Sequence, residues 1–197
     1  MLEPKLDNPL SEIQSVTILN LAEKFKAFDR TGESHEKIAD SILKIVSNAK
    51  DPAVRRKGLA LLGNYADDFG YDYGIPQVQD KIIDKIASIA AQDPDAAVKD
   101  NVLSTIIYRF DQPDSSGERH GQAVEAIKKI AASVTVSEDS SPEKTLIVKK
   151  AIDKLASYVK GLTTGREYFP EAQSKAKEAV DYLIATVGVE KFEHLKP

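Results

Sequence analysis

Apolar residues recur at helical spacing along nearly the whole chain. Ile152, Leu155 and Val159, for example, follow one another at steps of three and four residues. Such steps place side chains on one face of an amphipathic helix, and they also occur in residues 34–50 and 76–92. Because no alternating stretch of useful length predicts a β-strand, the chain is predicted to be all-α.

Nine prolines divide this helical pattern. Six fall where a pattern begins, a place where the missing N–H costs no hydrogen bond: Pro9, Pro52, Pro76, Pro94, Pro142 and Pro170. Asp51, Asp93 and Ser141 precede three of them and are predicted to cap helices with their side-chain oxygens. Ser11 and Gln14 have capping-box spacing and predict the start of the first helix. The predicted helices lie near 9–28, 34–50, 52–66, 76–92, 94–110, 119–134, 142–161 and 170–187, with a short one near 188–195.

The capped prolines reveal an internal repeat. In "DPAVRRKGLALL", "DPDAAVKDNVLSTI" and "SPEKTLIVKKAIDKL", a turn supplies Asp or Ser and then Pro, and a helix follows. The first core valine of each helix precedes Arg or Lys. These valines, Val54, Val98 and Val148, lie 44 and 50 residues apart. That spacing is the length of a two-helix unit in a helical repeat protein.

This pattern resembles the HEAT repeat family. "DPDAAVKDNVLSTI" is the nearest copy, with Val98-Lys99 where the family favours Val-Arg, whereas the first stretch is two residues shorter before its valine and the third two longer. The resemblance covers residues 34–162 and implies three helix-pair repeats. It implies a right-handed α-solenoid of about three to four pairs forming one domain over residues 1–197, with residues 1–30 and 163–197 as capping helices. An antiparallel multi-helix bundle is the alternative.

The resemblance also implies that the second helix of each pair lines a concave surface. The three second helices together carry ten basic and four acidic residues, whereas the whole chain has a net charge of −4. A basic face on an acidic protein would attract an acidic protein segment or another polyanion. The predicted contact residues on this face are Arg55, Arg56, Lys99, Arg109, Lys149, Lys150 and Lys154. The alternative is that these cations only solvate the exposed sides of their helices.

Three longer connections are predicted on one edge of the stacked pairs: "DDFGYDYGI", "DQPDSSGERHG" and "GLTTGREYF". Long loops on one edge of a repeat array often bind partners. The candidate contact residues are Tyr71, Asp72 and Tyr73 in the first loop, the Glu118-Arg119 pair and His120 in the second, and Arg166 in the third. Tyr65 is predicted to continue a core face instead. Tyr108, Phe110, Tyr158 and Phe169 occupy comparable helix ends, which assigns them to the repeat structure.

No catalytic, metal or cofactor site is predicted. The three histidines are far apart in the sequence, and Glu190 with His194 would supply only two metal ligands. The loop "DDFGYDYG" lacks the residue order of a calcium loop, and "GLTTGR" lacks the spacing of a phosphate loop. Gly161 is better explained as a helix C-cap.

The function predicted from these features is that of a non-catalytic, protein-binding scaffold module. The absence of cysteine excludes disulfides and thiolate sites and fits a reducing, cytoplasmic compartment. The first residues do not have the pattern of a signal peptide, and no run of about 18 apolar residues predicts a membrane span. Two alternatives stay open: a nucleic-acid binder that uses the basic face, and a helical enzyme or enzyme accessory factor.

Overall fold

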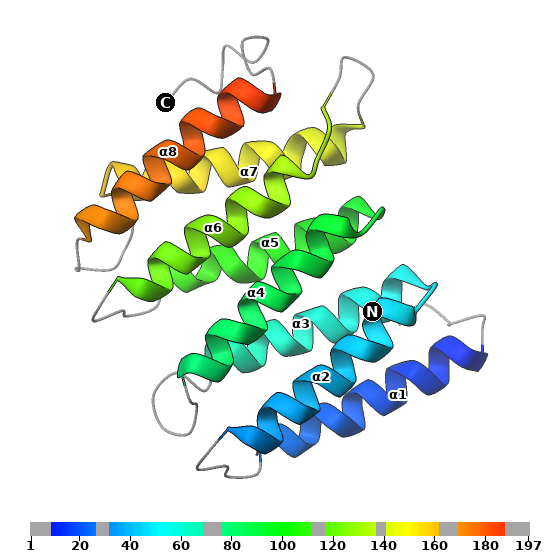
Figure 1. Cartoon of the computed structure of the whole chain (residues 1–197). Helices are drawn as coiled ribbons and strands as arrows, with labels where there is room; N and C mark the ends of the chain where they lie inside the picture. Colours follow the sequence, from blue (N-terminus) through cyan, green and yellow to red (C-terminus); the bar gives the residue numbers. More distant parts are fainter. Residues whose placement is uncertain are drawn as a thin grey trace. The chain divides into compact units, whose positions relative to one another are not determined.

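The computed structural model describes residues 9–26, 32–68, 76–111, 117–136, 141–161 and 169–187 (Figure 1). The α-helices are α1 (Pro9–Glu23), α2 (Glu33–Asn48), α3 (Pro52–Asp68), α4 (Pro76–Gln92), α5 (Ala96–Tyr108), α6 (Glu118–Ala132), α7 (Pro142–Val159) and α8 (Pro170–Val187). Short 3-10 helices, η1 (Lys24–Lys26) and η2 (Arg109–Asp111), extend α1 and α5. No strand occurs among the described residues, which confirms the all-α prediction. The short helix predicted near 188–195 lies outside them.

Two aspartates near the starts of α3 and α5 show which predicted caps form. The Asp51 carboxylate accepts a hydrogen bond from the Ala53 N–H at 2.8 Å, as predicted for the start of α3. In α5 the cap is Asp95, which accepts from Ala97 N–H and Val98 N–H at 2.8 and 3.1 Å. The prediction that Asp93 caps this helix was wrong, because its buried carboxylate accepts from the Asp95 N–H within the preceding turn.

The two serine caps were also predicted incorrectly. α1 begins at Pro9, so Ser11 lies inside the helix, where it is buried. Ser141 does precede α7, but its side chain makes no capping hydrogen bond. Its carbonyl oxygen accepts from Lys144 N–H and Thr145 N–H instead.

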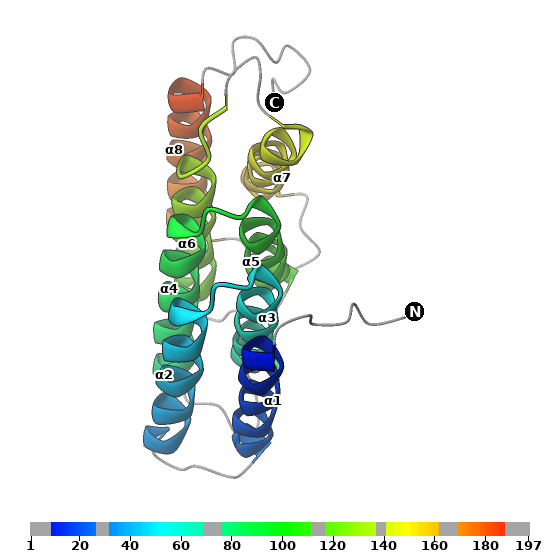
Figure 2. The same ribbon diagram turned by 90° about the vertical axis from the view of Figure 1, so that its right-hand side faces the viewer.

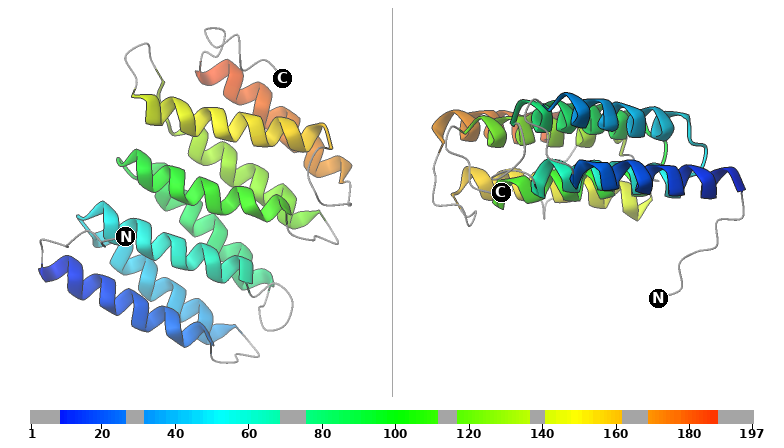
Figure 3. Two further views of the ribbon diagram at one scale, coloured as in Figure 1. Left: turned by 180° about the vertical axis from the view of Figure 1, so that it is seen from behind. Right: turned by 90° about the horizontal axis from the view of Figure 1, so that it is seen from below.

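The chain divides into two compact units, residues 1–82 (unit 1) and 83–197 (unit 2), and the division falls within α4. In unit 1, α1 packs against both α2 and α3, and α2 packs against α3. Figure 3 shows α1 and α3 side by side with α2 behind them. Gly58 permits this packing, because a Cβ atom there would lie 2.3 Å from Cγ2 of Val46 and 3.3 Å from Cδ1 of Ile18.

Unit 2 has two layers of helices. α6 and α8 lie in one layer with the second half of α4, and α5 and α7 lie in the other (Figure 2). α8 packs against both α6 and α7, and α5 packs against α7 and α6. The core between the layers is mainly aliphatic: Ile86, Val102, Leu103, Ile106, Ile127, Ile130, Ile152, Leu155 and Leu183. α8 also buries three alanines, whose small side chains permit close helix packing: Ala172, Ala176 and Ala179.

A helix needs about 20 mainly apolar residues to cross the hydrocarbon core of a membrane. None of the helices in the described part of the chain is both long and apolar enough to cross a membrane.

Candidate functional site

Two of the predicted contact cations make hydrogen bonds to the ends of neighbouring helices. Arg55 Nη1 donates to the carbonyl oxygens of Ala49 and Lys50, just after α2, at 3.1 and 2.7 Å. Lys99 Nζ donates to the carbonyl oxygen of Ala91 at 2.6 Å and to Ser133 Oγ at 2.8 Å. Cations in these positions satisfy carbonyl groups that have no partner within their own helix. The fold therefore uses Arg55 and Lys99 internally.

The environment of Lys99 alters its acidity. Its side chain is buried, at 8% exposure, and this burial lowers the pKa of the ammonium group below its usual value of 10.5. The negative charge of Asp93 raises this pKa and partly opposes the effect of burial, whereas the nearby positive charge of Lys144 lowers it further. Lys99 is thus a buried cation between helix ends.

The remaining predicted cations occupy different environments. Lys149 forms an ion pair with Asp153 at 2.7 Å, one helical turn away. Lys150 of α7 forms an ion pair with Asp100 of α5 and donates to Ser104 Oγ at 3.1 Å. Arg109 is buried, Lys154 is half-buried and Arg56 is exposed. In unit 2, α7 brings Lys149, Lys150 and Lys154 together, but acidic residues of the same layer pair with two of them.

The predicted loop residues are only partly described. Tyr71, Asp72, Tyr73 and Arg166 lie outside the described residues. At the start of α6, Glu118 is exposed and Arg119 is half-buried. His120 is buried, at 2% exposure, which places it in the core and not on an accessible edge.

His120 lies in a cluster of aromatic side chains. Its Nδ1 shares a hydrogen bond of 3.0 Å with the Tyr158 hydroxyl. The rings of Phe110 and Phe169 lie 5.7 and 5.6 Å from the imidazole, between centroids. The preceding Gly117 has a φ of 77°, a left-handed conformation that favours glycine. A Cβ atom there would also lie 2.6 Å from the Phe169 ring.

Unit 1 contains a similar cluster. His35 Nδ1 shares a hydrogen bond of 2.7 Å with the Tyr65 hydroxyl, and Phe25 stacks on Tyr65 with 3.9 Å between ring centroids. Gly32, before α2, has a φ of 73°. One sequence pattern marks both clusters: Phe, six further residues, Gly-Glu, one residue and His. It begins at Phe25 and begins again 85 residues later, at Phe110. We interpret both as structural clusters at helix ends.

The aromatic residues at helix ends were predicted mostly correctly. Tyr65, Phe110 and Tyr158 are buried, as expected for repeat structure. Phe169 packs on His120. Tyr108 is 54% exposed and was wrongly assigned to this group, whereas Phe110, two residues further on in η2, is fully buried.

α4 and α8 begin differently from α2 and α6. Each starts with proline and has glutamine at its fourth position, Gln79 in α4 and Gln173 in α8. Gln173 Nε2 donates to the carbonyl oxygen of Tyr158 at 3.3 Å. The side-chain amide of Gln79 is fully buried and has no hydrogen-bond partner in the structure. Among these four helices, the Gly-Glu starts of α2 and α6 alternate with the proline starts of α4 and α8.

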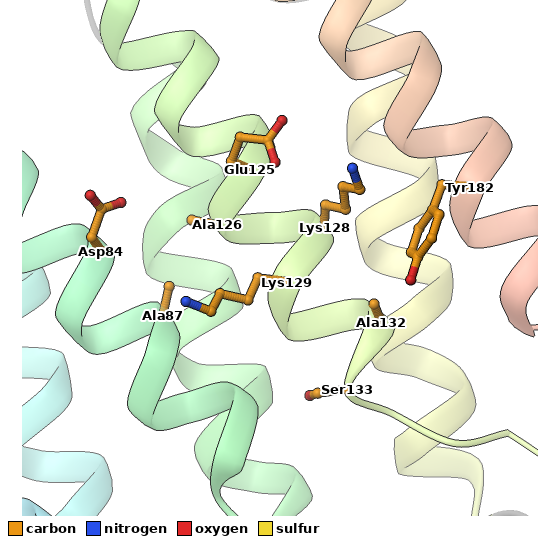
Figure 4. A pocket seen from close by; sticks show the side chains of 9 residues that line it. All are labelled: Asp84, Ala87, Glu125, Ala126, Lys128, Lys129, Ala132, Ser133 and Tyr182. Carbon is orange, nitrogen blue, oxygen red and sulfur yellow. The ribbon is translucent and has the colours of Figure 1, made fainter.

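A groove lies over α6 in unit 2 (Figure 4). Its volume is about 770 Å³, and its lining residues come from α4, α6 with its C-cap, and α8: Asp84, Ala87, Glu125, Ala126, Lys128, Lys129, Ala132, Ser133 and Tyr182. Tyr182 is 45% exposed, and Lys128 Nζ lies 5.0 Å from its ring centroid. Lys129 Nζ donates to Ser88 Oγ of α4 at 2.7 Å. Both lysines are thus oriented by neighbouring helices.

A second hollow adjoins the first along α6. It has a volume of about 380 Å³ and shares Asp84 and Glu125 with the groove. It continues towards Gly117 and Phe169. In the first hollow, Lys128 of α6 lies towards α8 and Lys129 of α6 lies towards α4, whereas Asp84 and Glu125 lie where the two hollows meet. The charge of the surface over α6 therefore changes along the helix.

The sequence prediction missed this groove because it assigned binding to the second helices of the pairs. The groove lies on α4, α6 and α8, which are the other layer of unit 2. Polar and small residues of α6 do recur at helical spacing, at Glu125, Lys128 and Ala132. That periodicity identifies an outward face of α6. It does not identify the helices that flank it.

A metal site needs about three His, Cys, Asp or Glu side chains close together. Among the residues that the structure describes, no group of three or more could hold a metal ion. Comparison with known proteins adds no further guide to the site, because no protein-family model and no curated protein matches this sequence.

Proposed function

We propose that the chain is a non-catalytic, protein-binding helical-repeat module, and that the groove over α6 holds an acidic segment of the partner. The observation that carries the proposal is the arrangement of Lys128, Lys129 and Tyr182. Two cations and an exposed aromatic ring line one open hollow of about 770 Å³, and each lysine is held by a group on a neighbouring helix.

The fixed orientation of the lysines favours binding. A flexible surface lysine loses side-chain entropy when it pairs with a ligand, and a lysine already held in place loses less. Carboxylates of the partner would pair with the ammonium groups of Lys128 and Lys129. Tyr182 would add apolar contact and a phenol hydroxyl, a combination common at protein interfaces.

A repeat architecture belongs to the same proposal. The Asp-Pro and Val-Arg/Lys pattern supports a right-handed solenoid of about three to four HEAT-like pairs. Consecutive helices pack against one another from α1 to α3 in unit 1 and from α5 to α8 in unit 2, as stacked pairs require. In this proposal the groove lies on the first helices of the pairs, and not on the second helices that carry Lys149 and Lys150.

A peptide-binding experiment tests the proposal. A library of fluorescent 12-residue peptides rich in Asp and Glu would be titrated against the full chain, with neutral peptides of equal length as reference. Isotope-labelled protein would then locate the bound peptide by NMR. We expect chemical-shift changes at Lys128, Lys129 and Tyr182. The double variant Lys128→Glu with Lys129→Glu should weaken peptide binding at least about tenfold, which corresponds to a loss of about 1.4 kcal/mol of binding free energy.

A matched pair on the other layer supplies the control. Lys149→Glu with Lys150→Glu makes the same change of charge on α7 and should leave peptide affinity within about twofold, since exposed charges far from a site are screened. Loss of binding in this variant alone would overturn the groove assignment. Binding of duplex DNA that weakens steeply with added salt would instead favour the nucleic-acid alternative.

A further inference from the structure

The two hollows over α6 adjoin one another and differ in charge. They share Asp84 of α4 and Glu125 of α6, whose carboxylates lie where the hollows meet. Figure 4 shows these two residues towards one end of the groove, with Lys129 and Ser133 further along α6. A partner segment that covers both hollows therefore meets charges of both signs.

The second hollow carries an excess of negative charge. In the described structure its lining includes four carboxylates and one lysine: Asp84, Glu118, Glu125, Glu171 and Lys175. The lysine is already paired with Glu171, one helical turn away, at 3.2 Å. Among the described residues no ion pair holds Asp84 or Glu125, and Lys129, one turn after Glu125, donates to Ser88 Oγ instead. The charge of these two carboxylates is thus open to a ligand.

The second hollow also has walls that suit a long cationic side chain. Gly117 and Gly121 line it four residues apart on α6, so neither contributes a side chain that would fill it. A Cβ atom at Gly121 would lie 3.8 Å from the nearest atom of another helix, Nζ of Lys175. Phe169 and Ala172 add apolar surface. Arginine and lysine pack their aliphatic stems on such a surface while the charged end reaches a polar group.

A wholly acidic segment would not suit both hollows. Its carboxylates would pair with Lys128 and Lys129, but at the far end they would approach Asp84 and Glu125. Like charges placed across an interface weaken binding, and unlike charges fix the register of the partner. A change of charge along the segment removes this conflict.

The dimensions of α6 give the spacing of that change. Gly121 in the second hollow and Lys129 in the first are eight residues apart. Eight residues of α-helix extend about 12 Å, a length that an extended peptide covers in about four residues.

We infer that the partner segment is bipolar, with acidic residues over Lys128 and Lys129 and a basic residue about four positions away. The basic side chain enters the second hollow and pairs with the carboxylates of Asp84 and Glu125. This inference rests on the proposed function, because it adds a second, opposite contact to the same bound segment. The acidic hollow thereby disfavours segments that are acidic throughout, which is a source of specificity.

Fluorescent 12-residue peptides titrated against the full chain test this inference. The reference peptide carries an Asp pair in a background of Gly, Ser and Gln, and two bipolar peptides carry arginines about four positions before or after that pair. We expect the arginines to strengthen binding at least about threefold in one of the two orders, as exposed ion pairs allow. With Asp84→Asn and Glu125→Gln together, this gain should disappear, while the reference peptide should bind equally well or more tightly.

A matched variant on the other layer supplies the control. Glu143→Gln with Asp153→Asn removes two carboxylates from α7, so the net charge of the chain changes by the same amount, and the gain from arginine should remain. A gain lost equally in both variants would show only general attraction to an acidic chain and would overturn the inference. Reference binding that depends on Lys128 and Lys129, with no gain from arginine in either order, would also overturn it but leave the proposed function standing. Absence of binding by every peptide would overturn both.

Discussion

The histidine clusters of the two units are built alike but enclosed differently. In unit 1, Phe25 stacks closely on Tyr65, with 3.9 Å between ring centroids and an 18° angle between planes. In unit 2, the corresponding Phe110 and Tyr158 lie 4.6 Å apart at 34°. Among the described residues, Phe169 adds a further aromatic ring at His120, edge-on. The same local sequence thus forms the same histidine–tyrosine contact in both units, while the angle between the phenylalanine and tyrosine rings differs.

The glycines before α2 and α6 give the largest expected difference between the clusters. Gly32→Ala should lower the free energy of unfolding by about 1–2 kcal/mol, because alanine is strained in a left-handed conformation. Gly117→Ala should lower it by about 2–5 kcal/mol, since its new methyl group would also collide with Phe169. Urea unfolding of both variants measures these losses. A loss of only about 1–2 kcal/mol for Gly117→Ala, the cost of the backbone strain alone, would show that Phe169 moves aside at little cost.

The tyrosine hydroxyls should contribute similarly in the two units. Tyr65→Phe and Tyr158→Phe each remove a hydroxyl that bonds to a buried histidine, and each should cost about 1–3 kcal/mol of unfolding free energy. Tyr108→Phe changes an exposed ring and should stay within about 0.5 kcal/mol of the parent protein. Thermal unfolding of the three variants checks the order. A loss in one cluster only would break the equivalence of the clusters.

The smallest expected effect concerns the cations next to the helix ends, Arg55 in unit 1 and Lys99 in unit 2. Because burial lowers the pKa of folded Lys99 below 10.5, the unfolded chain holds more protons between those two pKa values. The cost of burying the charged ammonium is therefore fully present below the folded pKa. It disappears as pH rises through the folded pKa towards 10.5.

Unfolding by urea from neutral pH to about pH 10.5 measures this dependence. The stability of the parent protein minus that of Lys99→Met should increase with pH. The corresponding difference for Arg55→Met should stay flat, since a guanidinium remains charged throughout. A flat difference for Lys99 would mean that its ammonium is as well solvated in the fold as in the unfolded chain.

Periodicity and proline placement predict the helices because both act locally. A proline at a helix start and a repeat of three and four residues have the same meaning wherever the helix packs. The start of α5 shows the limit of local reasoning. Asp93 and Asp95 both have capping side chains, and turn geometry decides that Asp95 caps the helix while Asp93 bonds to its N–H.

The clusters and the groove depend on contacts distant in sequence. His35 and Tyr65 are 30 residues apart in the sequence, and His120 and Tyr158 are 38 apart. A repeat of 44–50 residues therefore does not indicate that these histidines and tyrosines are in contact. Lys128 becomes part of a groove only when α8 places Tyr182 beside it. A helical pattern indicates which side of α6 faces outward, but tertiary packing determines which residues share that surface.

The alternation of helix starts has a consequence for how such a chain could be lengthened. Gly-Glu-x-His begins α2 and α6, whereas Pro-x-x-Gln begins α4 and α8, and the histidine returns after 85 residues. Insertion of a single helix pair would place two starts of one kind in succession. Insertion of a copy of residues 33–117 would preserve the alternation and supply every new histidine with its tyrosine. For protein engineering within the proposed repeat architecture, the unit to insert is therefore four helices long.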